Sequence, residues 1–292
     1  MLAHRAGLVS VSLSVLITIT TLAQRRDPPI DLETTLTRAG ARVEQYYARA
    51  TSLICREELR LQPVTASLMN QGPERRIVSE LRVSWEPTAE PGSRPEPSIV
   101  RQVLTIDGRP PRPGDEPGCL DPKPTSPEPL AVLLEQHRVD YVFSLAGSRR
   151  TDGRVSLLID YQPRAKRPGE VTWRGDCFDA TVPMAGRVWI DAETGDVLRL
   201  DERLVEKFEF PVPPERRKKS GPTSMLIERA ESSVRYERIR FRNPDETLML
   251  PVSATTFAIV YGSGVPAVRT SQRFSDWKRF LTDGRLVFPT ER

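Results

Sequence analysis

Alternation of apolar and polar residues with a period of two constrains this chain more than any other sequence feature. It is clearest over residues 186–205, a stretch that contains a short polar loop near its middle. Such alternation is typical of strands with one face in an apolar interior and the other in water. Gly195 supplies the positive φ that a hairpin loop of four or five residues needs. The stretch therefore predicts two antiparallel strands, whose apolar positions are Val188, Ile190, Leu198, Leu200 and Leu204.

The rest of the chain alternates between strand and helix patterns. Asp31 is an N-cap candidate, and apolar residues at spacings of three and four then run to Ile54, which predicts a long amphipathic helix. Ser126-Pro127 predicts the start of a short helix that ends near Val139. Further strands are expected near residues 59–63, 77–85, 99–106, 141–145, 155–161, 234–241, 248–261 and 265–274, with loops over 162–184 and 211–222. Short connections without repeated βαβ units predict an α+β fold with a curved, mainly antiparallel sheet, a long N-terminal helix and a short internal helix.

The N-terminus has the pattern of an export signal. Arg5 precedes an apolar run that ends in Thr21-Leu22-Ala23, where small residues occupy the positions that signal peptidase reads. We expect a signal peptide over 1–23, a linker over 24–30 and a single domain over 31–292, with proline-rich insertions at 86–97 and 108–127. The alternative is an uncleaved membrane anchor. Cleavage predicts a periplasmic or extracellular protein.

The chain has 3 cysteines, so at least one is unpaired within a monomer. Cys119 and Cys177 both fall in expected loops, and an exported compartment permits a disulfide between them. Cys55 falls at the end of the expected helix and is interpreted as a small buried hydrophobe. The disulfide pairing predicted is therefore Cys119–Cys177.

The residue patterns of most enzymes and metalloproteins are missing from the sequence. Beyond the expected signal peptide the only histidine is His137, and no nucleophile elbow, His-Glu-x-x-His, Cys-x-x-Cys, EF-hand loop or phosphate-binding glycine loop occurs. Glu57 and Glu58 are adjacent, so on a strand they point to opposite faces and are not expected to share a site. We therefore expect no catalytic residue, no metal and no cofactor, and a protein that is not an enzyme.

The densest run of positive charge lies in the expected loop 211–222. It comprises Arg216, Arg217, Lys218 and Lys219. A nucleic-acid site would need aromatic stacking residues beside such a run, and the loop has none. Contact with an anionic lipid surface at the membrane periphery remains open, as does a simple solvated loop.

Several of these patterns together resemble the lipoprotein-carrier (LolA-like) superfamily of the bacterial periplasm, and most closely its larger uncharacterised members. The resemblance is carried by Gly186–Leu200, and it is supported by the hairpin over 141–161 and by the Glu57-Glu58 pair. It implies an incompletely closed antiparallel half-barrel whose concave apolar face, covered by helices, holds acyl chains or senses lipidated envelope material. Our leading hypothesis is thus an exported, non-enzymatic carrier or sensor for an acyl chain or a lipidated partner.

The candidate ligand surface is the set of inward-facing aliphatic residues of the expected strands. It comprises Leu81, Val83, Leu157, Ile159, Val188, Ile190, Leu198 and Leu200. Periodicity alone leaves open whether these side chains line a cavity or form an ordinary core filled by the helices. The alternative function is accordingly a structural or protein-interaction module of the cell envelope, without a ligand cavity.

Overall fold

The protein is described by a computed structural model that covers residues 31–50, 53–65, 67–86, 96–115, 128–151, 154–175, 177–217, 219–242, 245–264, 266–280 and 286–287. The signal peptide and the linker expected over 1–23 and 24–30 lie outside these residues and stay predictions. Residues Asp31–Arg292 form a compact unit.

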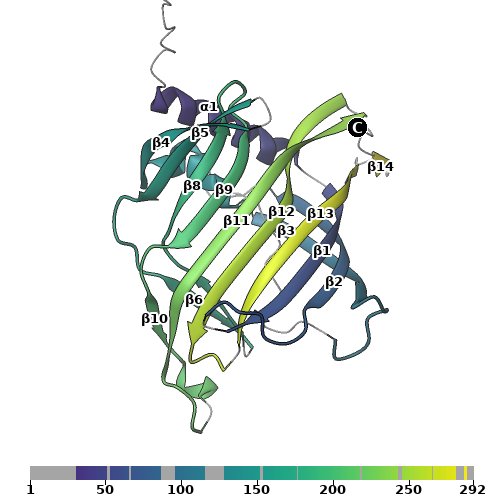
Figure 1. The fold of residues 1–292 in the computed structure, drawn as a ribbon, viewed down its shortest axis with the longest axis vertical. Coiled ribbons are helices and arrows are strands. Elements are labelled where there is room, and N and C mark those ends of the chain that lie inside the picture. The colour runs from purple at the N-terminus through teal and green to yellow at the C-terminus, as the bar shows by residue number, and fades with distance from the viewer. Residues whose placement is uncertain are drawn as a thin grey trace, which may run out of the picture. The chain divides into compact units, whose positions relative to one another are not determined.

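A 12-stranded sheet organises this unit, and its main path runs β3-β2-β1-β13-β12-β11-β9-β8-β5-β4 (Figure 1). Neighbouring strands are antiparallel throughout. Within the described residues β3 and β4 end the path without pairing with each other, so the sheet is not closed. The predicted α+β fold with an unclosed, mainly antiparallel sheet is confirmed.

The strands of the main path have these bounds: β1 Leu53–Val64, β2 Arg75–Glu86, β3 Glu96–Ile106, β4 Tyr141–Thr151, β5 Arg154–Pro163, β8 Met184–Asp191, β9 Val197–Leu204, β11 Ser224–Arg242, β12 Asp245–Tyr261 and β13 Ala267–Phe280. Two short strands attach to it: β10, Phe208–Pro211, pairs with β11, and β14, Leu286–Val287, pairs with β13. The ends of the predicted insertion 86–97 thus belong to β2 and β3, while its centre lies outside the described residues.

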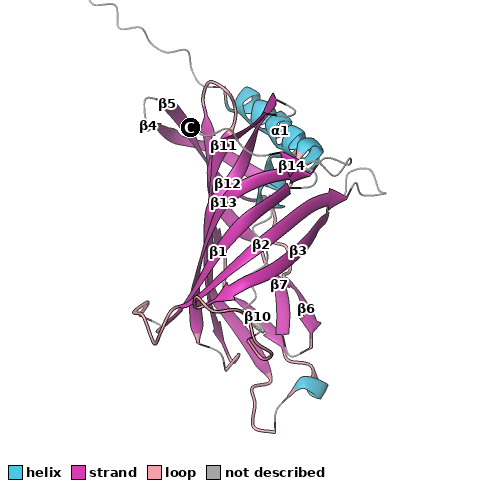
Figure 2. Ribbon diagram, turned by 90° about the vertical axis from the view of Figure 1, so that its right-hand side faces the viewer, coloured by secondary structure: helices cyan, strands magenta, loops and turns pink. Residues whose placement is uncertain are grey.

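The sheet is curved, and helix α1, Leu32–Arg49, lies on its inner side (Figure 2). Asp31 caps the helix, because its side chain accepts a hydrogen bond of 3.2 Å from the Glu33 backbone N–H. The expected extension of this helix to Ile54 is wrong, since the helix ends at Arg49 and β1 begins at Leu53. Leu53, Ile54 and Cys55 are all buried in β1 between two neighbouring strands, and pairing along both edges outweighs the local helical spacing.

The predicted internal helix is two short elements rather than one. A 3-10 helix, η2, spans Glu128–Leu133, and a single α-helical turn, α2, spans Glu135–Arg138. Leu134 between them is extended, with φ −66° and ψ 141°. The run Leu130–Leu134 is buried throughout, which an α-helix with one apolar face could not achieve.

Residues 170–181 form a small hairpin where the sequence predicted a loop. Strands β6, Glu170–Arg174, and β7, Cys177–Thr181, make a separate 2-stranded sheet. Trp173 and Phe178 pack against each other and against Phe210 of β10, with ring centroids 5.0 to 6.2 Å apart. This aromatic packing supplies an apolar contact that such a short hairpin lacks by itself. Pro211 ends β10, and the other described residues of the predicted loop 211–222 form no helix or strand apart from one 3-10 turn, η3, at Pro214–Arg216.

Candidate functional site

The inner face of the sheet is the candidate site, and it contains most of the predicted ligand surface. Leu81, Leu157, Ile159, Val188, Ile190 and Leu200 are all buried, and Val83 is partly buried against the same core. Leu198 is also only partly buried. The β8–β9 register shifts between Trp189 and Ile190, so that Val197 rather than Leu198 pairs with Ile190 and enters the core. A bulge of this kind cannot be read from strict alternation.

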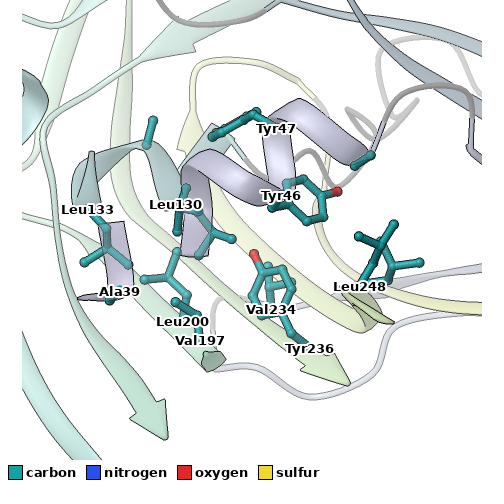
Figure 3. Close-up of a cluster of buried hydrophobic side chains, with 14 of the residues drawn as sticks. Ala39, Tyr46, Tyr47, Leu130, Leu133, Val197, Leu200, Val234, Tyr236 and Leu248 are labelled. Carbon is teal, nitrogen blue, oxygen red and sulfur yellow. The ribbon is translucent and has the colours of Figure 1, made fainter. Parts of the chain in front are cut away.

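Helical segments cover this face. The buried stripe of α1 consists of Leu36, Ala39, Gly40, Val43, Tyr46 and Tyr47. These side chains join those of η2 and of the sheet in one apolar cluster (Figure 3). Gly40 brings the two covering segments close together, because a Cβ at this position would lie 2.7 Å from the Leu133 carbonyl oxygen. In this conformation the predicted ligand surface is therefore in contact with the protein's own helices.

A small set of polar contacts holds α1 on the β8–β9 turn, and we call these contacts the helix clamp. Arg38 Nη1 donates hydrogen bonds to the carbonyl oxygens of Ala192 and Glu193, at 3.2 and 3.4 Å. Arg42 Nε donates to the carbonyl oxygen of Thr194 at 3.0 Å. Gly195, with φ +76°, is buried against the Arg38 side chain. The clamp joins exposed guanidinium groups to the carbonyl groups of a turn, and Arg42 Nε also lies 3.6 Å from Asp196 Oδ1.

The β8–β9 turn, to which the helix clamp binds, is itself ordered by the buried carboxylate of Asp191. It accepts hydrogen bonds from the backbone N–H groups of Glu193 and Thr194, at 3.0 and 2.9 Å, and it is ion-paired with Arg154 at 2.6 Å. Burial opposes ionisation of Asp191, yet the bonds from Thr194, the charge of Arg154 and the bond from Glu193 together hold its pKa below the ordinary value. The charged carboxylate thus fixes the loop of the predicted hairpin.

A cavity of about 280 Å³ opens where α1 meets the sheet, and we call it the helix-edge pocket. Its lining comes from α1, η2, the β8–β9 turn, β9, β11 and β12 and comprises Arg42, Val43, Gln45, Tyr46, Arg49, Leu130, Asp196, Val197, Tyr236, Arg238, Thr247, Leu248 and Met249. Tyr236 on the sheet and Tyr46 on the helix lie on facing sides of this region (Figure 3). Apolar walls with several guanidinium groups make it an amphipathic pocket.

Polar groups are also buried on the inner face of the sheet. Glu57 on β1 is 0% exposed, and it accepts bonds from Arg101 Nε at 2.7 Å, Arg101 Nη2 at 3.2 Å and Gln272 Nε2 at 2.9 Å. The hydroxyls of Ser79 and Tyr236 and the indole N–H of Trp277 are buried without a hydrogen-bond partner. Burial is the main cause that raises the pKa of Tyr236 well above its usual range, so its hydroxyl stays protonated and able to donate. The inner face is therefore apolar but carries unused hydrogen-bonding capacity.

Glu57 and Glu58 point to opposite faces, as expected. Glu58 lies on the outer face, where Arg60 Nη2 and Arg76 Nη2 pair with it at 2.7 and 2.5 Å. The hydrogen bonds from Arg76 and Arg60 lower its pKa. Glu57, its neighbour on β1, is fully enclosed. The sequence carries no local signal for this burial, because its partners lie 44 and 215 residues away.

The outer face carries a broad, open groove of about 930 Å³ with a polar lining. Three of its five lining arginines are ion-paired, namely Arg187 with Asp160 at 2.5 Å, Arg199 with Asp201 at 2.7 Å and Arg229 with Glu231 at 2.8 Å. Arg199 also lies 4.8 Å over the Trp189 ring. Because five arginines face four carboxylates, the groove has little net charge and gives no indication of a particular ligand.

The remaining predicted site residues lie away from the inner face or outside the described residues. Cys177 on β7 is disulfide-bonded and Cys55 is a free, buried thiol; Cys119 lies outside the described residues, so the Cys119–Cys177 pairing stays a prediction. In the basic run, Arg217 donates a 2.8 Å bond to the Val212 carbonyl and Arg216 lies 5.6 Å over the Trp173 ring. Lys219 is exposed, and Lys218 lies outside the described residues. Contact of Arg216, Arg217, Lys218 and Lys219 with an anionic surface stays a prediction.

The described part of the chain contains no group of three or more His, Cys, Asp and Glu side chains placed to hold a metal ion. No helix within it has the length and apolar character needed to span a membrane.

Comparisons with known proteins gave matches among solved structures, while no family model and no curated protein matches the chain. A LolA superfamily protein from Nitrosomonas europaea is 12% identical over 87% of this chain and 96% of its own, with a TM-score of 0.32. A DUF1329 family protein from Desulfovibrio piger is 9% identical over 86% and 93%, with a TM-score of 0.37. The Pseudomonas aeruginosa MucA/MucB complex is 12% identical over 83% and 94%, with a TM-score of 0.24.

The TM-scores of these matches are all below 0.5. The chain is similar, at low sequence identity and high coverage, to solved structures of the LolA superfamily, the family whose pattern its sequence resembles.

Proposed function

We propose that this protein is an exported, non-enzymatic carrier or sensor that holds an apolar chain between its helical cover and the inner face of its sheet. The chain would be a free acyl chain or the lipid of a lipidated partner. The observation that carries the proposal is the nature of the cover. Two helical segments, rather than a second sheet, bury the apolar face.

The energetics of this cover favour exchange with a ligand. Burying apolar side chains contributes a favourable free energy of about 25 cal/mol per Å² of buried surface, whether the covering atoms belong to α1 or to an acyl chain. A ligand that replaces part of the cover therefore recovers much of the free energy lost when α1 moves. The helix clamp adds exposed hydrogen bonds, which contribute modestly because water competes for them. The unpartnered polar atoms of Ser79, Tyr236 and Trp277 also disfavour a permanently filled interior.

The test is uptake of a dansyl-labelled fatty acid, measured by the rise in dansyl fluorescence. We expect saturable uptake by the wild-type protein and a faster association rate for Arg42→Ala, which removes a clamp hydrogen bond. Arg56→Ala is the matched control, because Arg56 is exposed on β1 outside the clamp. Absence of saturable uptake in all three proteins would contradict the proposal.

The alternative is a docking module of the cell envelope whose inner face stays filled. It is favoured by the burial of Ile159, Val188, Ile190 and Leu200, each of which is 0% exposed. It predicts two results together. Crosslinking through Lys219 captures a protein partner, and the protein takes up no dansyl-labelled fatty acid.

A further inference from the structure

The helix-edge pocket combines three features that together indicate a ligand class. Its walls are apolar, its rim is positively charged, and a buried hydroxyl among its lining residues lacks a partner. This inference rests on the proposed function, since it names the ligand that the same cover would hold.

The walls suit a single apolar chain. Val43, Leu130, Val197 and Leu248 are buried, and Met249 is partly buried beside them. The volume of about 280 Å³ lies just below the range of about 300–1,000 Å³ typical of small-molecule pockets. A cavity of this size accepts one slender chain rather than a lipid with several chains.

The rim carries an excess of positive charge. Arg42, Arg49 and Arg238 line it, against the single carboxylate of Asp196. Asp196 Oδ2 accepts a 2.8 Å hydrogen bond from Arg238 Nε, and Asp196 Oδ1 lies 3.6 Å from Arg42 Nε. Asp196 is therefore already engaged by two of the guanidinium groups.

Arg49 is the guanidinium group with spare binding capacity. It is exposed in the last turn of α1, and among the residues that the structure describes no carboxylate pairs with it. Burial, and after it the nearby positive charge of Arg49, lower the pKa of Arg279, which is itself paired with Glu246. An anion at this rim would relieve the repulsion between Arg49 and Arg279.

Tyr236 provides an independent indication of a polar ligand group. Its side chain lines the pocket and is 4% exposed, yet its hydroxyl has no hydrogen-bond partner. A buried hydroxyl without a partner is costly, and a ligand oxygen could accept its hydrogen bond.

We propose that the helix-edge pocket binds a single-chain amphiphile with an anionic head group. The apolar chain lies along Val43, Leu130 and Leu248, and Arg49 holds the head group at the rim. The Tyr236 hydroxyl, which is buried in the closed form, donates to the head group when α1 moves. A carboxylate and a phosphate share the required chemistry, because both present oxygen acceptors to guanidinium donors.

The experiment compares ligands with the same chain and different head groups by isothermal titration calorimetry, each below its micelle concentration. Decanoate should bind roughly tenfold more tightly than decyl maltoside or decyltrimethylammonium, because charge-assisted hydrogen bonds contribute about that factor. Decyl phosphate should behave as decanoate does. Inorganic phosphate, which has the charge without the chain, should bind far more weakly than either.

Variants then place the site. Arg49→Gln should weaken decanoate binding roughly fivefold to tenfold, the range for losing one partly exposed charged hydrogen bond, without changing decyl maltoside binding. Arg150→Gln, the same change at an exposed position of β4, is the control and should leave both affinities unchanged. Tyr236→Phe should weaken decanoate binding without lowering the melting temperature, because the hydroxyl has no partner in the unliganded protein.

The outcomes separate this inference from the proposed function. Equal affinities for decanoate, decyl maltoside and decyltrimethylammonium would overturn the head-group inference while leaving the carrier function intact. Absence of binding by every chain-bearing ligand would overturn both. Inorganic phosphate that binds as tightly as decanoate would also overturn the inference, since the pocket would then be a plain anion site.

Discussion

The buried carboxylate of Glu57 provides the sharpest test of how the inner face is built. Glu57→Gln preserves the side-chain shape but removes the charge that Arg101 and Gln272 both bind. Breaking a buried ion pair by removing one partner costs about 3–5 kcal/mol. The Arg101 side chain is 13% exposed, so some water reaches it, and we expect the lower end, about 3 kcal/mol.

Glu58→Gln is the matched control, because it makes the same change one residue later on the outer face. Glu58 is paired with Arg60 and Arg76, whose side chains are 48% and 50% exposed. Pairs of this kind are worth about 0.2–1 kcal/mol, so the control should lose less than about 1 kcal/mol.

Urea unfolding followed by tryptophan fluorescence would measure both variants. With a slope of about 3 kcal/mol per M, Glu57→Gln should lower the unfolding midpoint by about 1 M, and Glu58→Gln by less than about 0.3 M. If the two midpoints fall by the same amount, Glu57 does not support the inner face as an enclosed charge, and the reasoning is refuted.

Three further predictions concern local contacts. Gly40→Ala should lower the urea midpoint, although alanine favours a helix by about 1 kcal/mol, because its Cβ would lie 2.7 Å from the Leu133 carbonyl oxygen; a raised midpoint would show that α1 and η2 are not in contact there. Arg42→Ala should speed amide hydrogen exchange in α1 but not in the central strands, as measured by mass spectrometry; unchanged exchange in α1 would show that the clamp does not hold the helix. The hydrogen bond from Arg109 is the main cause that holds the pKa of Asp115 at about 2 against an ordinary value of 3.8. The stabilising effect of this hydrogen bond is complete above pH 3.8 and is lost as the pH falls through 2. Arg109→Gln should therefore raise the titration midpoint of Asp115, measured by NMR. An unchanged midpoint would exclude this pair.

Much of the sheet could be predicted from sequence because apolar and polar residues alternate over most of its strands. The hairpins of β4–β5 and β8–β9 were predicted in this way, and Gly195 does have the positive φ assigned to it. The prediction failed where local patterns are ambiguous. Ile54 and Cys55 satisfy a helical spacing, and only pairing with β2 and β13 makes them part of a strand.

The covered inner face was predictable in outline and the helix-edge pocket was not. Inward-facing aliphatic residues such as Ile159 and Val188 follow directly from alternation. The pocket instead depends on how α1 crosses the ends of β9, β11 and β12. This crossing places Arg49 and Tyr236, which are far apart in the sequence, in the lining of one pocket. No local pattern encodes such a crossing, because it depends on packing between distant segments.

Cys55, the free thiol buried under α1, gives the protein an intrinsic reporter of its own opening. Its side chain is 1% exposed, and burial raises its pKa well above the usual range, so the closed form contains almost no thiolate and offers no access to reagents. A maleimide can therefore modify Cys55 only while the cover is displaced, and the labelling rate measures how often that happens. The native chain can thus be followed through its open state without any introduced probe.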